Sequence, residues 1–252
     1  MSDLLLDKVA VVTGSNRGIG KSILEKFAQN KAEVFACARQ KNPEFENYCS
    51  ELSNKYKTKI HTIYFDLNNS DEIKKAIDQI KNLTNRVNIL VNNAGIIQTS
   101  LFQMTKIDDL KKTFNVNFFS PFLFSQYIVK LMIKNKTQSS IVNISSSAAI
   151  EANIGRSAYA ASKSALITLS KVMSKELSNF NIKVNAIAPG LTNTDMMNKS
   201  TEEKYLKETI SRTSQKRIAE PVEIANTVLF LASDLSSYVN GQVIRVDGGL
   251  HE

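Results

Sequence analysis

The stretch KVAVVT (Lys8–Thr13), followed at once by Gly14-Ser15-Asn16-Arg17-Gly18-Ile19-Gly20, decides the fold. Its first six residues form a short apolar run, which is typical of a strand that is buried on both faces. The glycines let the backbone turn sharply and approach a pyrophosphate at the positive end of a helix dipole. The spacing is Gly-x-x-x-Gly-x-Gly and not Gly-x-Gly-x-x-Gly. A turn that forms for steric reasons alone, without a ligand, is therefore the alternative interpretation. The stretch predicts a strand, a phosphate-binding turn and a helix.

The same alternation of strand and helix continues along the chain. Further short apolar runs predict strands at Glu33–Ala38, Ile60–Phe65, Val87–Asn92, Ser140–Ile144, Lys183–Ala188 and Val243–Val246. The segments between them predict helices at Ile19–Gln29, Asp71–Leu83, Asp108–Lys134, Ser157–Ser178 and Val222–Ala232. This order specifies a parallel sheet with helices on both faces and ligands at the carboxyl ends of the strands. We therefore predict an α/β protein with a single-domain, doubly wound Rossmann fold of about seven strands.

Composition limits the remaining possibilities. The 252 residues carry no Pro/Gly/Ser-rich linker, so residues 1–252 are expected to form one domain. We expect a cytoplasmic protein, because neither a signal peptide nor a membrane-spanning stretch is recognisable. The net charge is +8, but the lysines are spread along the chain, which argues against a nucleic-acid partner and favours anionic cofactors or acidic carrier proteins. His61 and His251 have no neighbours at ligand spacing, so no metal site is predicted.

The end of the second predicted strand indicates which dinucleotide would bind. Cys37-Ala38-Arg39-Gln40 lacks the carboxylate that usually holds the ribose 2′-hydroxyl of NAD. A guanidinium such as that of Arg39 can instead grip a 2′-phosphate through paired charged hydrogen bonds. Arg17, inside the glycine turn, would add a second positive contact. We predict NADP(H) as the cofactor, against the alternative of two surface arginines without a ligand.

Four motifs in this order resemble the short-chain dehydrogenase/reductase family: Thr13–Gly20, Asn92-Asn93-Ala94-Gly95, Tyr159-x-x-x-Lys163 and Pro189-Gly190. The resemblance implies a catalytic tetrad of Asn117, Ser146, Tyr159 and Lys163. Ser146 is chosen from three consecutive serines because it lies 13 residues before the tyrosine, and a register one residue away stays open. The residues expected to contact the cofactor are Gly14, Ser15, Asn16, Arg17, Gly18, Ile19, Gly20, Arg39, Asp66, Leu67, Asn93, Ala94, Gly95, Tyr159, Lys163, Pro189, Gly190, Leu191 and Thr194.

Several of these roles come from the resemblance alone. Asp66 would contact the adenine, and residues 93–95 would line the adenosine ribose. Thr194 would contact the carboxamide or the phosphates. Lys163 would also bind the nicotinamide ribose, while Asn117 would hold a water between the lysine and solvent.

The spacing of Tyr159 and Lys163 suggests how acid–base chemistry would work. Four residues apart on a helix, the two side chains share one face. A phenol is a poor proton shuttle at neutral pH, and a nearby ammonium would lower its pKa. We expect Tyr159 to donate a proton to a carbonyl oxygen during reduction, with Ser146 hydrogen-bonding the same oxygen.

The substrate is less well indicated. The stretches IVNISS, AYAASKSAL and KVNAIAPGLTNTDMM are similar to bacterial 3-oxoacyl-(acyl-carrier-protein) reductases, which implies a carrier-linked substrate and fatty acid biosynthesis. Those reductases dock the carrier with arginines, whereas Thr137 and Phe180 stand at the matching positions here; Lys134, Lys136 and Lys183 lie close in sequence and would substitute. The resemblance implies substrate contacts at about residues 96–104, 150–157 and 198–216, and the last of these segments is polar and helical. A lid is expected over about residues 191–217.

Two other functions stay open. One is a reductase or dehydrogenase of a sugar or another specialised ketone, which needs no carrier. The other is a catalytically silent protein that senses NADP, although an intact tetrad argues against it. The resemblance also implies a homotetramer, with the predicted helices 108–134 and 157–178 pairing at one interface and helix 222–232 with the last strand at another.

Overall fold

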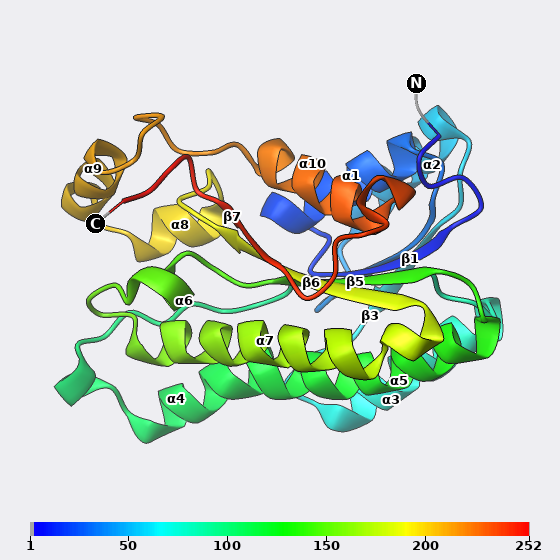
Figure 1. The fold of residues 1–252 in the computed structure, drawn as a ribbon, viewed down its shortest axis with the longest axis horizontal. Helices are drawn as coiled ribbons and strands as arrows, with labels where there is room; N and C mark the ends of the chain where they lie inside the picture. The colour runs from blue at the N-terminus through cyan, green and yellow to red at the C-terminus, as the bar shows by residue number, and fades with distance from the viewer. Residues whose placement is uncertain (1–2, 252) are drawn as a thin grey trace.

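Seven parallel strands form one sheet in the order β3-β2-β1-β4-β5-β6-β7 (Figure 1). The computed structural model describes residues 3–251. The strands are β1 (Val9–Thr13), β2 (Glu33–Ala38), β3 (Ile60–Tyr64), β4 (Ile89–Asn92), β5 (Ser139–Ile144), β6 (Ile182–Pro189) and β7 (Val243–Val246). The strand order reverses between β1 and β4, which is where a doubly wound sheet leaves room for a ligand. The predicted fold class is confirmed, and the strand boundaries differ from the predicted ones by at most two residues.

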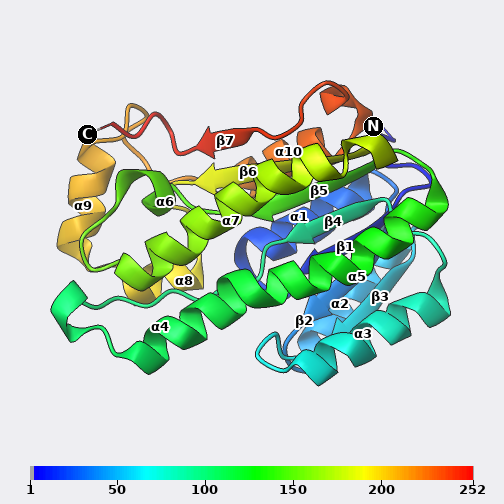
Figure 2. The same ribbon diagram turned by 60° about the horizontal axis from the view of Figure 1, so that its bottom comes forward.

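Helices cover both faces of the sheet (Figures 1 and 2). One face carries α1 (Gly18–Gln29), α2 (Pro43–Tyr56) and α10 (Pro221–Ala232), and the other carries α3 (Ser70–Leu83), α5 (Ser120–Asn135) and α7 (Ser157–Glu176). The remaining helices are α4 (Ile107–Phe114), α6 (Ala148–Glu151), α8 (Asp195–Ser200) and α9 (Glu203–Ser211), with short 3₁₀ turns at Phe102–Met104, Ser178–Phe180 and Asp234–Ser236.

The apolar run of β1 explains why the sheet is buried on both sides. Ala10 and Val12 belong to the core on the α1 face, whereas Val9 and Val11 belong to the core on the α3 face. Successive side chains of a strand point to opposite faces, so a strand between two helix layers must be apolar at every position.

Three helices were not predicted, and one predicted helix is divided. The segment Asp108–Lys134 contains α4, a π-helical stretch at Asn115–Phe119 and α5. Such π segments are frequent at functional sites. Helix α2 was not predicted, although Phe45, Cys49 and Leu52 have the spacing of one buried helix face, Asn42 caps it and Pro43 occupies the first turn. The other two are α6 and α8, whereas α9 lies in the segment 198–216 that was expected to be helical.

The continuous helical run 107–135 is long and apolar enough, by length and composition, to cross a membrane. Its apolar face is nevertheless occupied within the fold. Phe124, Ile128 and Met132 are completely buried in the core between α5 and the sheet. The apolar composition of this run is therefore explained by packing as a core helix.

Candidate active site

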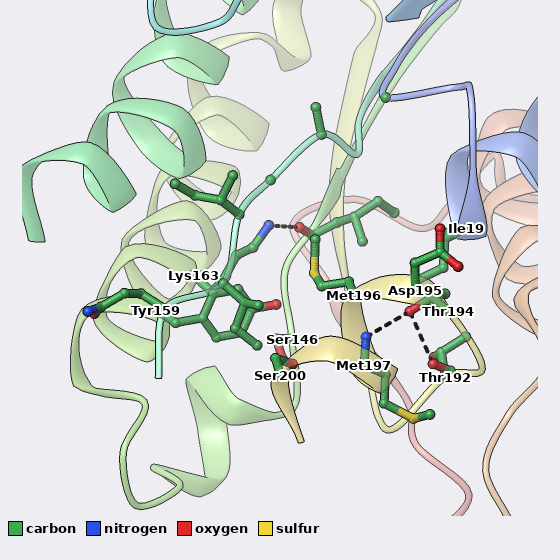
Figure 3. Close-up of a pocket in the computed structure, with 18 of the residues that line it drawn as sticks. Ile19, Ser146, Tyr159, Lys163, Thr192, Thr194, Asp195, Met196, Met197 and Ser200 are labelled. Carbon is green, nitrogen blue, oxygen red and sulfur yellow. Dashed lines mark hydrogen bonds between the residues drawn. The ribbon is translucent and has the colours of Figure 1, made fainter. Parts of the chain in front are cut away.

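A cleft of about 1600 Å³ opens at the carboxyl ends of the strands (Figure 3). It brings together segments that are far apart in the sequence, from the glycine turn to the segment after β6. Of the predicted site residues, the cleft is lined by Gly14, Asn16, Arg17, Gly18, Ile19, Gly20, Arg39, Asp66, Leu67, Asn93, Ala94, Gly95, Ser146, Tyr159, Lys163, Pro189, Gly190, Leu191 and Thr194. The position at the strand ends agrees with the one expected for a doubly wound sheet.

The glycine turn is shaped to receive an anion. Gly14 has φ +69°, and a Cβ on Gly20 would lie 2.1 Å from the Gly14 carbonyl oxygen, so neither position accepts a side chain. Helix α1 begins directly after the turn with no side-chain cap and no acidic residue in its first turn. Its first N–H groups therefore stay available for a charged ligand, and a pyrophosphate fits both the charge and the uncapped helix end.

Asn93 stabilises the glycine turn from the end of β4. Its amide nitrogen Nδ2 donates to the carbonyl oxygens of Thr13 (2.9 Å) and Gly14 (3.2 Å). The Thr13 hydroxyl in turn accepts from the backbone N–H groups of Asn93 (3.0 Å) and Ala94 (3.1 Å). These bonds join the ends of β1 and β4 across the point where the strand order reverses.

Two predicted site residues point away from the cleft. Ser15 is fully buried, and its hydroxyl donates to the Val12 carbonyl at 2.7 Å. Asn117, in the π-helical stretch, is also fully buried. Its side-chain amide accepts a hydrogen bond from the Ile96 N–H and donates one to the Ile96 carbonyl, each at 2.9 Å. Asn117 also donates to the Ser162 hydroxyl at 3.0 Å. In this structure Asn117 thus holds the loop after β4 against α7.

Tyr159 and Ser146 face each other in the cleft (Figure 3). Tyr159 lies on the buried face of α7 and is only 9% exposed. Burial raises the pKa of the phenol, while a hydrogen bond with the Ser146 hydroxyl and the positive charge of Arg156 oppose the rise. The phenol is therefore protonated at neutral pH, which is the form that a proton donor needs.

The neighbouring serines have other partners or positions. Ser145 is buried, and its hydroxyl donates to the Lys163 carbonyl at 2.9 Å. The backbone N–H of Ser147 donates to the Pro189 carbonyl at 2.8 Å and ties this loop to β6. Of the three serines, Ser146 is the one whose hydroxyl acts on Tyr159.

Lys163 is buried one turn further along α7. Its Nζ lies 6.0 Å from the centre of the Tyr159 ring and donates to the Ile144 carbonyl at 2.7 Å. Burial lowers the pKa of this ammonium to about 8. We expected Lys163 to lower the pKa of the phenol, but the cation that does so in this structure is Arg156.

The lysines expected near the cleft entrance lie elsewhere in this chain. Lys183 is 7% exposed, and its Nζ donates to the Ser233 carbonyl (2.7 Å) and the Ser236 hydroxyl (2.5 Å). Lys134 and Lys136 flank the end of α5, which leads into the amino end of β5, whereas the cleft lies at the carboxyl end. The prediction that Lys183 docks a carrier is wrong, because sequence proximity to a strand does not say at which end or how deeply a side chain lies.

The serine register gives a direct test. Ser146→Ala is expected to lower kcat for carbonyl reduction by about 100-fold, because a preorganised donor to a developing oxyanion is lost. Ser147→Ala, a neighbouring serine in the same loop, is the matched control and should change kcat by less than about threefold. A larger effect in Ser147→Ala would move the catalytic register by one residue.

A glycine turn at the head of a doubly wound sheet, with a protonated tyrosine in the same cleft, defines a dinucleotide-dependent oxidoreductase. A family model described as enoyl-(acyl carrier protein) reductase matches residues 13–251. The chain is 39% identical to the 3-oxoacyl-[acyl-carrier-protein] reductase of Aquifex aeolicus, over 98% of each chain. It is 37% identical to a 3alpha-hydroxysteroid dehydrogenase of Mediterraneibacter gnavus, over 97% of each chain.

Solved structures agree with these matches. A putative NAD(P)-dependent gluconate 5-dehydrogenase of Beutenbergia cavernae, solved with bound NADP at low occupancy, superposes with a TM-score of 0.92 at 28% identity, over 99% of each chain. The protein belongs to the short-chain dehydrogenase/reductase family. It is an oxidoreductase that acts on CH–OH or C=O groups with NADP(H), which confirms the predicted enzyme class and cofactor.

Proposed function

We propose that the protein reduces the 3-oxo group of an acyl thioester, carried by an acyl carrier protein, to a secondary alcohol. The observation that carries this proposal is the pairing of Tyr159 with Ser146 in the cleft that also holds the glycine turn. The relative from Aquifex aeolicus, named as a reductase of this kind, supports the substrate class. A reductase of a sugar derivative is the second candidate, favoured by the similarity to the gluconate dehydrogenase structure.

Some residues of the cleft would bind the cofactor, and others would transfer the proton. The uncapped start of α1 and the glycine turn would hold the pyrophosphate, and Arg39 with Arg17 would hold the 2′-phosphate. When bound, NADPH supplies the hydride to the carbonyl carbon. Tyr159 donates its phenolic proton to the carbonyl oxygen, and the Ser146 hydroxyl stabilises the negative charge that develops there.

Lys163 is the third polar residue of the proposed catalytic group, with its Nζ 6.0 Å from the centre of the Tyr159 ring. Its ammonium donates to the Ile144 carbonyl in this structure, and we propose that it also binds the nicotinamide ribose. Gly95 leaves room for it, because a Cβ there would lie 3.3 Å from the lysine Nζ and 3.1 Å from Asn117 Oδ1. Asn117 thus positions the loop that carries Gly95 and Ile96.

The segment after β6 is proposed to act as a lid over residues 191–217. It contains α8 and α9 and begins above the glycine turn, since a Cβ on Gly18 would lie 3.1 Å from Thr194 Cγ2. Thr194 caps α8 by accepting from the Met197 N–H at 3.3 Å. Lid closure would exclude water from the reacting carbonyl.

Replacing Arg39 tests the cofactor preference. Arg39→Asp is expected to raise the KM for NADPH by about 100-fold while improving use of NADH, because a carboxylate repels the 2′-phosphate and accepts from a 2′-hydroxyl. The measurement is kcat/KM for both cofactors at saturating substrate. An unchanged preference would shift the discrimination to Arg17, and Arg17→Ala in the Arg39→Asp background would then identify it.

The homotetramer and the cytoplasmic location stay predictions. Exposed apolar side chains, among them Phe122 of α5 and Val172 of α7, would be covered in a tetramer. We expect sedimentation equilibrium to give about four times the mass of one chain. A mass near 28.1 kDa would contradict the prediction.

The function is tested by following NADPH oxidation by absorbance with a panel of carbonyl compounds. The panel contains acetoacetyl thioesters, free and linked to an acyl carrier protein, together with keto-sugars, keto-sugar acids and simple ketones. A strong preference for the carrier-linked thioester is the expected result. Turnover of another ketone with no activity on thioesters would leave the proposed chemistry in place and overturn the substrate assignment.

A further inference from the structure

Arg156 is a cation in the cleft that lacks a counterion. It directly precedes α7, lies three residues before Tyr159 and lines the same cleft. Its side chain is half-buried, and this burial lowers the pKa of the guanidinium. Across residues 3–251 no carboxylate forms an ion pair with it, whereas Arg217 and Arg245 both pair with carboxylates. A partly desolvated guanidinium is stabilised by acceptor oxygens of a ligand, and an anionic oxygen stabilises it more than a neutral carbonyl does.

The contacts of Arg156 are all with neutral oxygens. Its guanidinium donates to the Thr99 hydroxyl, to the Ser200 carbonyl at 2.7 Å and to the Thr201 hydroxyl at 3.3 Å. These partners come from the loop after β4 and from the end of α8. Arginine carries five N–H donors, so these three bonds leave donor capacity on a residue that lines the cleft.

A second polar group at the same place has no partner. The hydroxyl of Ser200 is shielded from solvent, and within the described part of the chain it makes no hydrogen bond. Buried hydroxyls are nearly always hydrogen-bonded, so an unpaired one beside a cleft calls for a partner, which a ligand oxygen or an ordered water can supply. Figure 3 shows Ser200 among the side chains that line the same pocket as Ser146 and Tyr159.

We propose that Arg156 and Ser200 form a subsite for a second oxygen of the substrate, close to the reacting carbonyl. The ligand atom is an acceptor oxygen, either the acyl carbonyl of a 3-oxoacyl thioester or the carboxylate of an oxo acid. This inference rests on the proposed function, in which the two carbonyls of the substrate are separated by one carbon. Arg156 and Ser200 would thus determine specificity by fixing which of the two carbonyls faces Tyr159.

Three substrates with the same four-carbon keto chain test the subsite. Acetoacetyl-pantetheine carries an acyl carbonyl, acetoacetate carries a carboxylate, and 2-butanone carries neither. Because Arg156 also acts on Tyr159, the change in kcat/KM for 2-butanone measures that effect alone. Arg156→Gln is expected to lower kcat/KM about 10-fold more for the thioester, or about 100-fold more for acetoacetate, than for 2-butanone. The larger of the first two losses identifies the oxygen that the subsite binds. Ser200→Ala should lower kcat/KM for the same substrate by a smaller factor.

Controls separate this role from two others. Arg86→Gln removes the same charge from an exposed position at the opposite end of the sheet. This variant should leave kcat/KM for all three substrates unchanged. A loss of kcat/KM in Arg156→Gln that is equal for all three substrates would show that Arg156 acts only through Tyr159, which overturns the subsite. A similar loss in Thr201→Val, where only the lid contact is removed, would assign Arg156 to holding the lid.

Failure of the proposed function gives a different pattern. A wild-type enzyme that is inactive on the thioester but prefers acetoacetate to 2-butanone would overturn the thioester assignment and retain the subsite. A wild-type enzyme that does not prefer either two-oxygen substrate to 2-butanone would overturn the subsite. NADPH affinity, measured by fluorescence titration, verifies that each variant is folded.

Discussion

Tyr159→Phe is expected to lower kcat for carbonyl reduction by about 1000-fold while NADPH binding stays within about threefold of wild type. The substitution removes one hydroxyl and keeps the ring, so the packing of a side chain that is 9% exposed is preserved. The lost hydroxyl is the proposed proton donor, and burial keeps it protonated by raising its pKa. The measurement is steady-state NADPH oxidation together with a binding titration.

A matched variant separates the loss of the proton donor from a general effect of the substitution. Tyr238 is fully exposed and does not line the cleft, so Tyr238→Phe should retain full activity. Retention of more than a tenth of wild-type kcat in Tyr159→Phe would assign the proton to another group. Turnover that depends on Tyr159 would also exclude the hypothesis of a silent NADP-sensing protein.

Lys163→Met is expected to lower kcat/KM by about 100-fold or more and to weaken NADPH binding at least about tenfold. Methionine keeps the length of the buried side chain, so the cavity that alanine would leave is avoided. The ammonium that donates to the Ile144 carbonyl is lost, and with it the proposed contact to the ribose. Normal kinetics in this variant would contradict the role of Lys163.

The pH dependence gives the same residue a second test. Burial lowers the pKa of Lys163 to about 8, so the ammonium is charged below this pH and neutral above it. We expect kcat/KM for reduction to fall as pH rises through about 8 in wild type. Lys163→Arg should lose this alkaline limb even where its activity is low, because arginine stays charged. A wild-type profile that is flat across this range would show that the charge of Lys163 is not required.

The local sequence was sufficient to predict the scaffold of the site. The run Glu33–Ala38 matches β2 residue for residue, because a strand buried on both faces needs a nearly uninterrupted apolar run. Val243–Val246 matches β7, which is the partly exposed edge strand of the sheet. The glycine turn was predictable for a similar reason, since the close approach of Gly20 to Gly14 excludes any other residue. Tyr159 and Lys163 lie together on the buried face of α7, as their spacing predicted.

The same local reasoning could not predict how deeply each side chain lies. Ser15 belongs to the glycine turn by sequence, but its hydroxyl is directed into the core. Lys183 has the composition of a docking residue and is buried beside Ser233 and Ser236. Arg156 belongs to none of the four recognised motifs, and the sequence placed it only within the segment 150–157 that was expected to contact the substrate.

The sequence by itself determined the alternation of strands and helices, the glycine turn and the pairing of Tyr159 with Lys163 on one helix face, because each depends on residues that are neighbours along the chain. The tertiary structure alone decided which charges act on that tyrosine. Thr99, Arg156 and Ser200 meet only when three separate segments fold over one cleft. Burial and charge then set the pKa values of Tyr159 and Lys163, and both depend on the distances between groups in space.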